Sequence, residues 1–241
     1  MTNKPAEFDK LATAYDDWHG ELIRGSGFGR EYFLEYKVCE VARVLAKKKF
    51  APKNILDFGC GVGDVEPYLQ KYFPDAKIFG VDISAESIET AKAKGLKNIE
   101  FAALDENRIE VTLAKFNTHF DLVFVAGVFH HAPKDEHFEI LNAIHVHMAQ
   151  SAKIFIFELN PCNPATRHVF AKYEKPVDRN ANLLPPRHLR GILRRLGLRT
   201  SRSVYTIFFP AALKIFLPLE KFLRCVPLGA HYYIFGEKGV K

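Results

Sequence analysis

The fold is decided by the stretch Asn54-Ile55-Leu56-Asp57-Phe58-Gly59-Cys60-Gly61-Val62-Gly63-Asp64. An apolar run that ends in an acid and then breaks into glycines indicates a short buried strand followed by a tight turn. Glycines at alternate positions let the backbone turn sharply and approach a ligand without an intervening Cβ atom. We expect a helix over residues 65–73 after the turn, which makes this stretch the start of a strand–turn–helix unit.

A second apolar run, Ile78-Phe79-Gly80-Val81-Asp82-Ile83-Ser84, also ends in an acid. Asp82 follows Gly63 by nineteen residues, a spacing that suits one strand–helix–strand unit. A carboxylate at a strand tip can accept hydrogen bonds from both hydroxyls of a ribose. The two runs together predict a pocket for an adenosine-type cofactor at the carboxyl ends of parallel strands.

The residue at position 64 bears on the identity of that cofactor. The dinucleotide fingerprint G-x-G-x-x-G has its last glycine or alanine where this chain has Asp64. An acid there would direct negative charge toward a pyrophosphate, with nothing nearby expected to offset it. This disfavours a nicotinamide oxidoreductase, as does the lack of a Tyr-x-x-x-Lys motif. The spacing Gly-x-Gly-x-Gly after Leu-Asp-Phe instead resembles class I S-adenosylmethionine-dependent methyltransferases.

The resemblance covers residues 8–160 and implies a doubly wound α/β fold. The expected sheet is mostly parallel and seven-stranded, with helices on both faces, N-terminal lid helices and a C-terminal helical insertion. The last strand is expected to run antiparallel. The cofactor is then S-adenosyl-L-methionine, and the resemblance assigns its contacts to Tyr15, Asp57, Gly59, Cys60, Gly61, Gly63, Asp82, Ile83, Asp105, Glu106 and Ala126.

Some of these contacts have alternatives. Tyr15 lies on an amphipathic stretch, residues 8–19, that either folds over the cofactor or packs on the sheet with Tyr15 as a core residue. Asp105 and Glu106 compete for the adenine amino group, and either is otherwise a loop acid. Ile83 is expected against the adenine face.

Three regions are expected along the chain. Residues 1–50 form N-terminal helices and a lid, residues 51–160 form the cofactor-binding α/β core, and residues 161–241 form a substrate-side segment that completes the sheet. Helices are expected over residues 31–49, 85–94, 135–150 and 187–196, and further strands over 98–106, 120–125, 153–159, 199–209 and 231–236.

Candidate catalytic residues follow the fourth and fifth of these strands. The resemblance places His130 and His131 where the transferred methyl group points, and Glu158 and Asn160 at the mouth of the pocket. A histidine titrates near neutral pH and can remove the proton of an oxygen or nitrogen acceptor. His131 is the first choice for this general base, His130 the second and Glu158 the next. The alternative is that the histidines only position the acceptor, or that His130 packs.

The net charge of +6 is unevenly distributed over the 241 residues. Residues 1–160 carry 19 Lys/Arg and 24 Asp/Glu, whereas residues 161–241 carry 15 and 4. The basic C-terminal third suggests an anionic partner, either a phosphorylated substrate, a membrane surface or a nucleic acid. The alternative is a solvated basic face.

The same third contains an apolar run, residues 208–219, beside nine Lys/Arg between Arg187 and Arg224. We expect residues 187–224 to form an interfacial surface that holds an anionic lipid-linked acceptor or contacts a membrane. The alternative for the run is a buried cap over the core or a dimer face. The oligomeric state is left open.

Several classes of protein are disfavoured because the sequence lacks the features that are typical of them. The four cysteines are scattered, so neither a disulfide framework nor a metal site is expected. An apolar leader and a run of about 20 apolar residues are not found, so we expect a cytoplasmic protein, with peripheral membrane contact left open. No nucleic-acid partner is expected.

The function is therefore predicted as methyl transfer to the oxygen or nitrogen of a small-molecule or lipid-linked acceptor. A nucleic-acid methyltransferase and a non-catalytic S-adenosylmethionine-binding protein are the alternatives.

Overall fold

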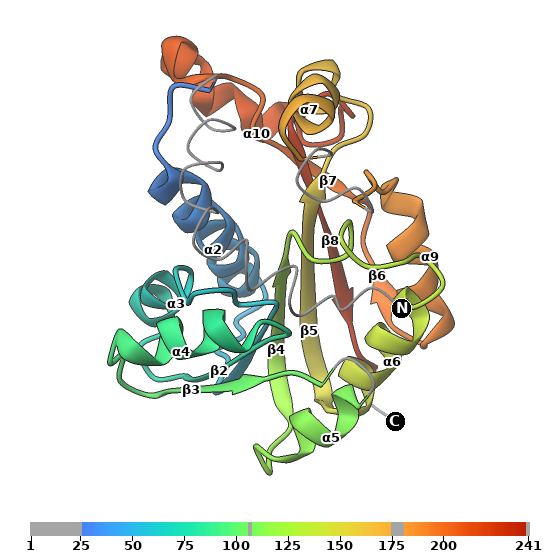
Figure 1. Cartoon of the computed structure of the whole chain (residues 1–241). Coiled ribbons are helices and arrows are strands. Elements are labelled where there is room, and N and C mark those ends of the chain that lie inside the picture. The colour runs from blue at the N-terminus through green and yellow to red at the C-terminus, as the bar shows by residue number, and fades with distance from the viewer. Residues whose placement is uncertain (1–25, 106–107, 175–180, 240–241) are drawn as a thin grey trace.

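A computed structural model describes residues 26–105, 108–174 and 181–239 of the chain. Its centre is one eight-stranded sheet with the order β3-β2-β1-β4-β5-β8-β6, and β7 also pairs with β8. Helices lie on both faces of this sheet (Figure 1). The five parallel strands are β1 (Asn54–Phe58), β2 (Lys77–Asp82), β3 (Ile99–Ala103), β4 (Phe120–Ala126) and β5 (Met148–Leu159). The doubly wound, mostly parallel sheet is therefore confirmed.

The antiparallel side of the sheet has one strand more than expected. The last strand, β8 (His231–Glu237), runs antiparallel to β5 as predicted. The sixth strand is divided into β6 (Arg199–Thr200) and β7 (Val204–Thr206). Thr200 pairs with Gly236 and Val204 with Tyr233, so the three residues 201–203 lie opposite the two residues 234–235. The extra residue is a bulge that interrupts the ladder.

Two helices cover one face of the sheet. Apolar side chains of α2 (Arg30–Lys47) and α3 (Glu66–Tyr72) pack with strand residues such as Phe124 and Phe155. Strands buried on both faces need apolar residues at successive positions, and the apolar runs of β1 and β4 supply them. The α4 helix (Ala85–Ala93) contacts β2 and β3, and the Ser84 Oγ atom caps it by accepting the Ser87 N–H at 3.0 Å.

The opposite face is covered by α5 (Ile109–Ala114), α6 (His137–Val146) and α9 (Pro186–Arg195). The remaining elements lie at the end of the molecule toward which β4 and β5 point, at the top of Figure 1. They are α7 (Pro164–Val169), the π-helical turn η1 (Phe170–Glu174), the 3₁₀ segment η2 (Ala211–Leu219) and α10 (Glu220–Leu223).

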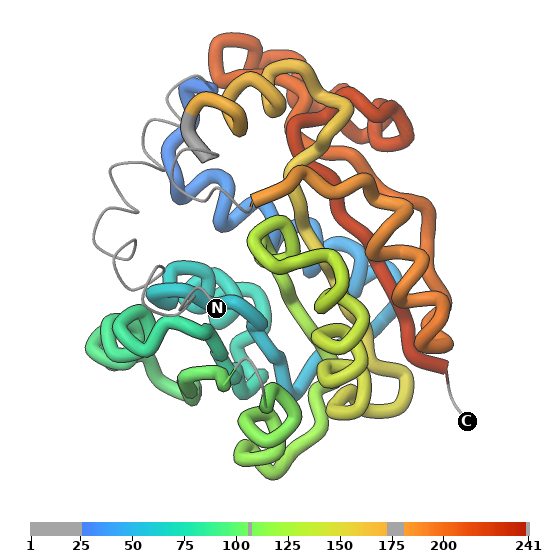
Figure 2. The backbone as a smooth tube through the Cα atoms, turned by 45° about the vertical axis from the view of Figure 1, so that its right-hand side comes forward, coloured from blue at the N-terminus to red at the C-terminus, as the bar shows by residue number. Residues whose placement is uncertain are grey.

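The C-terminal basic and apolar segments do not share one surface. The arginine-rich α9 lies against β6 and β8, on the right of Figure 1, while η2 projects at the upper left. Figure 2 shows the same separation after rotation. The expectation of a continuous basic and apolar surface over residues 187–224 is corrected accordingly, because α9 uses its leucines to cover the sheet far from η2. Among the described helices, none has both the length and the apolar composition to cross a membrane.

Candidate functional site

A cavity of about 1230 Å³ opens at the carboxyl ends of β1, β2, β4 and β5. Its walls come from α2, the glycine turn, the turn after β4, α7 and residues 207–210. Strand β1 has β2 on one side and β4 on the other, so the cavity lies where the strand order reverses. Ligands of open α/β sheets bind at this switch point. Its volume exceeds the roughly 300–1,000 Å³ of a pocket for one small molecule, which leaves room for two ligands side by side.

The glycine turn forms the floor of the cavity beside β1. Gly59, Gly61 and Gly63 have φ angles of 80°, 55° and 77°, a region that disfavours other residues. A Cβ atom on Gly59 would lie 2.2 Å from Val128 Cγ2, so the turn after β4 packs directly on this turn. A Cβ atom on Gly61 would meet nothing within 4 Å. The backbone at Gly61 therefore faces open space, as a close approach to a ligand requires.

Asp82 holds the glycine turn and the start of α4 together. Its Oδ2 atom accepts the Gly61 N–H at 2.9 Å, and its Oδ1 atom accepts the Ser84 N–H at 2.9 Å. Burial raises the pKa of this carboxyl, although its backbone hydrogen bonds oppose the shift. A carboxylate has about four acceptor positions. Asp82 lines the cavity and can accept further hydrogen bonds there.

Of the other predicted cofactor contacts near β1 and β2, three line the cavity and one does not. Cys60, Ile83 and Ala126 line the cavity, and burial raises the pKa of the Cys60 thiol well above its usual range. Asp57 is not among the lining residues. It lies buried with Glu66, and burial followed by the charge of Glu66 raises the pKa of its carboxyl. Asp57 is therefore a buried residue beside Glu66 and not part of the cavity lining.

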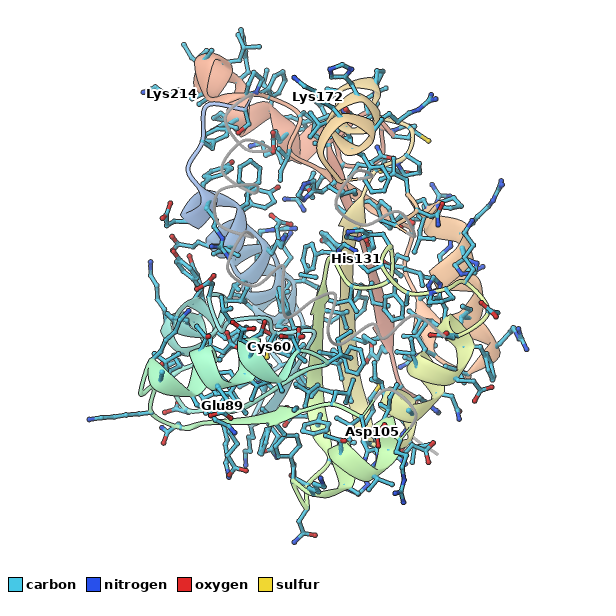
Figure 3. All side chains as sticks on the ribbon, viewed as in Figure 1. Cys60, Glu89, Asp105, His131, Lys172 and Lys214 are labelled. Atoms are coloured by element: carbon cyan, nitrogen blue, oxygen red, sulfur yellow. The ribbon has the colours of Figure 1, made fainter. Side chains whose placement is uncertain are left out.

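Of the two predicted adenine-binding acids, only Asp105 lies among the described residues. Asp105 is exposed and is absent from the lining residues, although its neighbour Leu104 is present. Figure 3 shows Asp105 low in the molecule, near α5 and away from His131. Glu106 and Tyr15 lie outside the described residues, so their roles stay predictions.

His130 and Glu158 form a buried pair at the cavity wall. His130 Nδ1 lies 2.7 Å from Glu158 Oε2, and the Phe129 N–H donates to Glu158 Oε1 at 2.8 Å. The side chains are only 5% and 2% exposed. They meet because β4 and β5 are neighbouring parallel strands that end together. An ionised carboxylate only accepts, so with Glu158 ionised Nδ1 carries the proton and Nε2 is the nitrogen that can accept one.

His131 also lines the cavity, but it is close to Asp82. Its ring centroid lies 4.0 Å from that of His130, and its charge favours the ionised form of Asp82. In Figure 3 its side chain lies at the carboxyl end of β4 and β5. His130 and His131 thus stand next to each other, with His130 bound to Glu158 and His131 nearer the carboxylate expected to bind ribose.

Asn160 was expected at the mouth of the pocket, but it is buried and its side chain forms hydrogen bonds to the backbone. It is fully buried, and its Nδ2 atom donates to the carbonyls of Pro227 at 3.1 Å and Gly229 at 2.7 Å. Its Oδ1 atom accepts the Cys162 N–H at 3.0 Å. These bonds join the chain after β5 to the segment before β8, and Asn160 does not line the cavity.

The contribution of α2 to the wall of the cavity was not predicted from the sequence. Arg30, Phe33, Leu34 and Lys37 line the cavity, and their spacing places them on one face of the helix. Burial lowers the pKa of Lys37 to about 8, although Glu158 and Asp57 act in the opposite direction. These four residues follow the i, i+3, i+4, i+7 spacing of one helix face, which could have indicated a face directed at the cavity. Because two of them are cations, the same spacing is also typical of a solvent-facing side of a helix.

Asp64 forms ion pairs with two cations. Arg30 Nη2 lies 2.5 Å from Asp64 Oδ2, and Lys94 pairs with the other oxygen. The acid is therefore offset by two cations, contrary to the expectation that nothing nearby does so. Both partners are distant in sequence, one on α2 and one at the end of α4. Asp64 on its own does not argue against a phosphate-containing cofactor.

Across 26–105, 108–174 and 181–239, no group of three or more His, Cys, Asp or Glu side chains could hold a metal ion. The cavity is thus characterised by its glycine floor, by Asp82 and by the pair of His130 and Glu158.

Comparisons with known proteins agree with this geometry. A protein-family model described as a methyltransferase domain matches residues 30–202. The carboxy-S-adenosyl-L-methionine synthase of Campylobacter jejuni subsp. jejuni serotype O:23/36 is 33% identical over 125 residues, which are 52% of this chain and 48% of that protein. The demethylmenaquinone methyltransferase of Thermotoga maritima is 28% identical over 156 residues, 65% of this chain and 61% of that protein. The chain thus spans about half the length of the first relative and about three fifths of the second.

A solved structure shows the same fold over the whole chain. It is the plantazolicin methyltransferase BpumL in complex with a triazolic desmethylPZN analog and SAH. Its TM-score is 0.65 at 16% identity, and the alignment covers 99% of this chain and 100% of that one. Because the family model matches well over half of the residues and the sheet has the same architecture, this chain belongs to the class I S-adenosylmethionine-dependent methyltransferases.

Proposed function

We propose that this protein transfers a methyl group from S-adenosylmethionine to an oxygen or nitrogen of a small-molecule or lipid-linked acceptor. The observation that carries the proposal is the buried His130–Glu158 pair, which lines the same cavity as the glycine turn and Asp82. A proton acceptor and a cofactor-binding end in one cavity are what alkylation of a hydroxyl or amine needs.

The residues at the glycine turn fit the proposed cofactor. The open space at Gly61 admits a ligand against the backbone, and Asp82 supplies acceptor atoms for ribose hydroxyls. Ile83 and Leu104 offer apolar surface nearby for an adenine ring. When bound, S-adenosylmethionine would supply an electrophilic methyl group on its sulfonium. The protein's part is then to hold the acceptor in line and to keep water out.

His130 is the better candidate for the general base, although sequence reasoning ranks His131 first. Its Nδ1–H group is held by Glu158, so Nε2 would take the acceptor proton and the carboxylate would stabilise the resulting imidazolium. This is the arrangement by which an acid orients a catalytic histidine in hydrolases. The charge of His131 lowers the pKa of Asp82, and we assign His131 to the cofactor side of the cavity.

The acceptor end of the cavity is mainly apolar and includes Lys37. Its walls include Phe33, Leu34, Val169, Phe170 and Phe208. Lys37, whose ammonium is disfavoured by burial, would gain from an anionic group on the acceptor. These features support an acceptor that combines an apolar body with an acidic group. The name of one relative, malonyl-[acyl-carrier protein] O-methyltransferase from Acetivibrio thermocellus, supports an acidic acceptor in kind.

A methylation screen tests this proposal. Radiolabelled S-adenosylmethionine is incubated with lipid and aqueous fractions of cell extract, and the label transferred to product is measured. We expect His130→Ala to lower turnover by about 10²–10⁴-fold, the usual contribution of a general base. Glu158→Gln should lower turnover as well, because an amide stabilises the imidazolium less well.

The controls separate cofactor binding from proton transfer. S-adenosylhomocysteine affinity, measured by calorimetry, should stay nearly unchanged in His130→Ala, and His119→Ala at an exposed histidine should keep full turnover. The proposal is wrong if the protein does not bind S-adenosylhomocysteine. If His130→Ala retains full turnover at saturating acceptor while His131→Ala loses it, the base is His131, as sequence reasoning ranks it.

A further inference from the structure

Exposed apolar side chains gather in one short segment of the chain. Of the nine large exposed hydrophobic residues among those described, seven lie between positions 213 and 228. We call residues 211–228 the apolar tip. Its exposed members are Leu213, Ile215, Phe216, Leu219, Phe222, Val226 and Leu228, and Ile215 and Phe222 are 80% and 73% exposed. A concentration of this kind on a protein surface marks an interaction site.

The outward orientation of these side chains follows from the local structure. η2 is a nine-residue 3₁₀ segment that contains Pro218 and has no buried residue. It projects at the upper left of Figure 1, beyond the ends of the strands. Within residues 26–105, 108–174 and 181–239, no sheet or helix buries the apolar residues of this segment.

The apolar tip is nevertheless firmly attached to the rest of the protein. Buried Glu220 accepts the N–H groups of Phe208 at 2.7 Å and Phe209 at 3.2 Å. Both terminal nitrogens of Arg224 lie 2.6 Å from the carboxylate oxygens of Glu40 on α2. The conformation is therefore fixed by buried polar bonds, so that little further ordering is needed when a partner binds.

The tip is continuous with the cavity wall. Phe208, Phe209 and Pro210 line the cavity, and the ring of Phe209 lies 5.7 Å from that of Phe216. Phe216 is exposed on the tip. An apolar path thus leads from the acceptor end of the cavity to the outer surface.

The exposed charges of the tip are positive. Lys214 and Lys221 are exposed on the tip, whereas its only acid, Glu220, is buried. The neighbouring α7 contains no acid, the next segment, η1, carries Lys172 and Glu174, and Lys172 lies at the same end as Lys214 in Figure 3. In a symmetric dimer through this patch, the lysines would meet their own copies without an exposed carboxylate between them. An anionic surface is the better complement.

We propose that the apolar tip docks the protein on the surface of a bilayer that contains anionic lipid. Leu213, Ile215, Phe216 and Phe222 would enter the boundary between headgroups and acyl chains, and Lys214 and Lys221 would contact anionic headgroups. The mouth of the cavity then faces the lipid. Entry of an acceptor with an apolar tail from the bilayer is a second step, which rests on the methyl transfer proposed above.

Vesicle sedimentation tests the docking. The full chain is mixed with phosphatidylcholine vesicles, with or without about one third phosphatidylglycerol. We expect binding to the anionic vesicles that weakens as salt rises. The double variant Ile215→Asp/Phe222→Asp should bind about tenfold less or weaker still, because two exposed apolar groups no longer enter the lipid. Lys214→Glu/Lys221→Glu should lose the preference for phosphatidylglycerol.

Matched variants make the result specific. Val146→Asp changes an exposed apolar residue on α6, and Arg187→Glu/Arg194→Glu reverses charges on α9, so both should bind vesicles like the unchanged protein. The docking is overturned if the unchanged protein fails to sediment with anionic vesicles at low salt. It is also overturned if ultracentrifugation finds a dimer that Phe222→Asp dissociates. Binding of S-adenosylhomocysteine in all variants keeps this outcome distinct from failure of the proposed function.

Discussion

The carboxyl edge of the sheet and the apolar tip both contain large apolar side chains, which are buried at the sheet and exposed at the tip. At the sheet, residues such as Ile156 and Phe124 are fully buried between helices on both faces. At the tip, Ile215 and Phe222 are among the most exposed apolar residues described. In both places the local sequence is mostly apolar. The burial of an apolar run is thus decided by the elements on either side of it, which the run itself does not reveal.

The two regions also differ in where their charge lies. The carboxyl edge collects acids around the glycine turn, namely the buried Asp57 and Glu66 and the half-buried Asp82. At the tip the only acid is buried, and lysines face outward. The first arrangement suits a site for hydroxyls and a cationic cofactor, and the second suits an anionic surface.

The largest expected effect is on the stability of the sheet. Ile156→Ala removes a side chain that is 0% exposed and packs in the main core. We expect the free energy of unfolding to fall by about 2–5 kcal/mol, from lost burial plus the cavity that remains. Urea denaturation followed by circular dichroism measures this. A loss below about 1 kcal/mol would show that β5 is less tightly packed than described.

The next effect concerns cofactor binding at the same edge. Asp82→Ala removes the acceptors of the Gly61 and Ser84 N–H groups as well as those proposed for ribose. S-adenosylhomocysteine affinity should weaken by about 1.5–3 kcal/mol, the scale for hydrogen bonds to a charged group. Calorimetry measures the change. Asp105→Ala, at the exposed acid outside the cavity, is the matched control and should have little effect. Equal losses in the two variants would argue for a contact of Asp105 with the cofactor.

The parts of the fold that follow local rules could be predicted from the sequence. The first strand has Asp57 as its last residue but one, the second ends at Asp82, and the glycines after the first mark a turn that needs positive φ. Ser84 predicts the start of α4, because a serine oxygen accepts an N–H group of the first turn. Such signals lie within a few residues of each other, so they are visible without knowledge of the packing.

The parts that depend on distant residues could not be predicted in this way. His130 and Glu158 were both candidates, but their bond depends on the register of β4 and β5. Lys37 enters the cavity only because α2 crosses above the strands, and Arg30 neutralises Asp64 for the same reason. The bulge that divides the sixth strand contains no glycine or proline from which it could have been predicted.

A third prediction tests the buried acids of the carboxyl edge through pH. Burial raises the pKa of Glu66 from 4.5 to about 7. Between these values the folded protein binds more protons than the unfolded chain, so this group makes stability fall as pH rises from 4.5 to 7. Glu66→Gln removes the ionisation. Its stability relative to the unchanged protein should be similar near pH 4.5 and higher by about 1–3 kcal/mol above pH 7.

Urea denaturation across this pH range measures the difference. Glu100→Gln, at an exposed residue paired with Lys77, is the matched control and should show no such increase. A Glu66→Gln variant whose relative stability is independent of pH would mean that Glu66 is not held as a buried acid beside Asp57.

The smallest expected effect gives the sharpest contrast with the sheet. Ile215→Ala makes the same chemical change as Ile156→Ala, but at a side chain that is 80% exposed. Little apolar surface returns to water on unfolding, and no cavity forms in the folded protein, so the free energy of unfolding should change by no more than about 0.5 kcal/mol. The same urea experiment measures it. If Ile215→Ala instead lost as much stability as Ile156→Ala, the side chain would have to be covered in solution by another part of the chain or by a second copy. In that case the tip would be an internal or dimer contact. A near-zero change together with weaker vesicle binding would instead show that Ile215 contributes to binding a partner and hardly at all to folding.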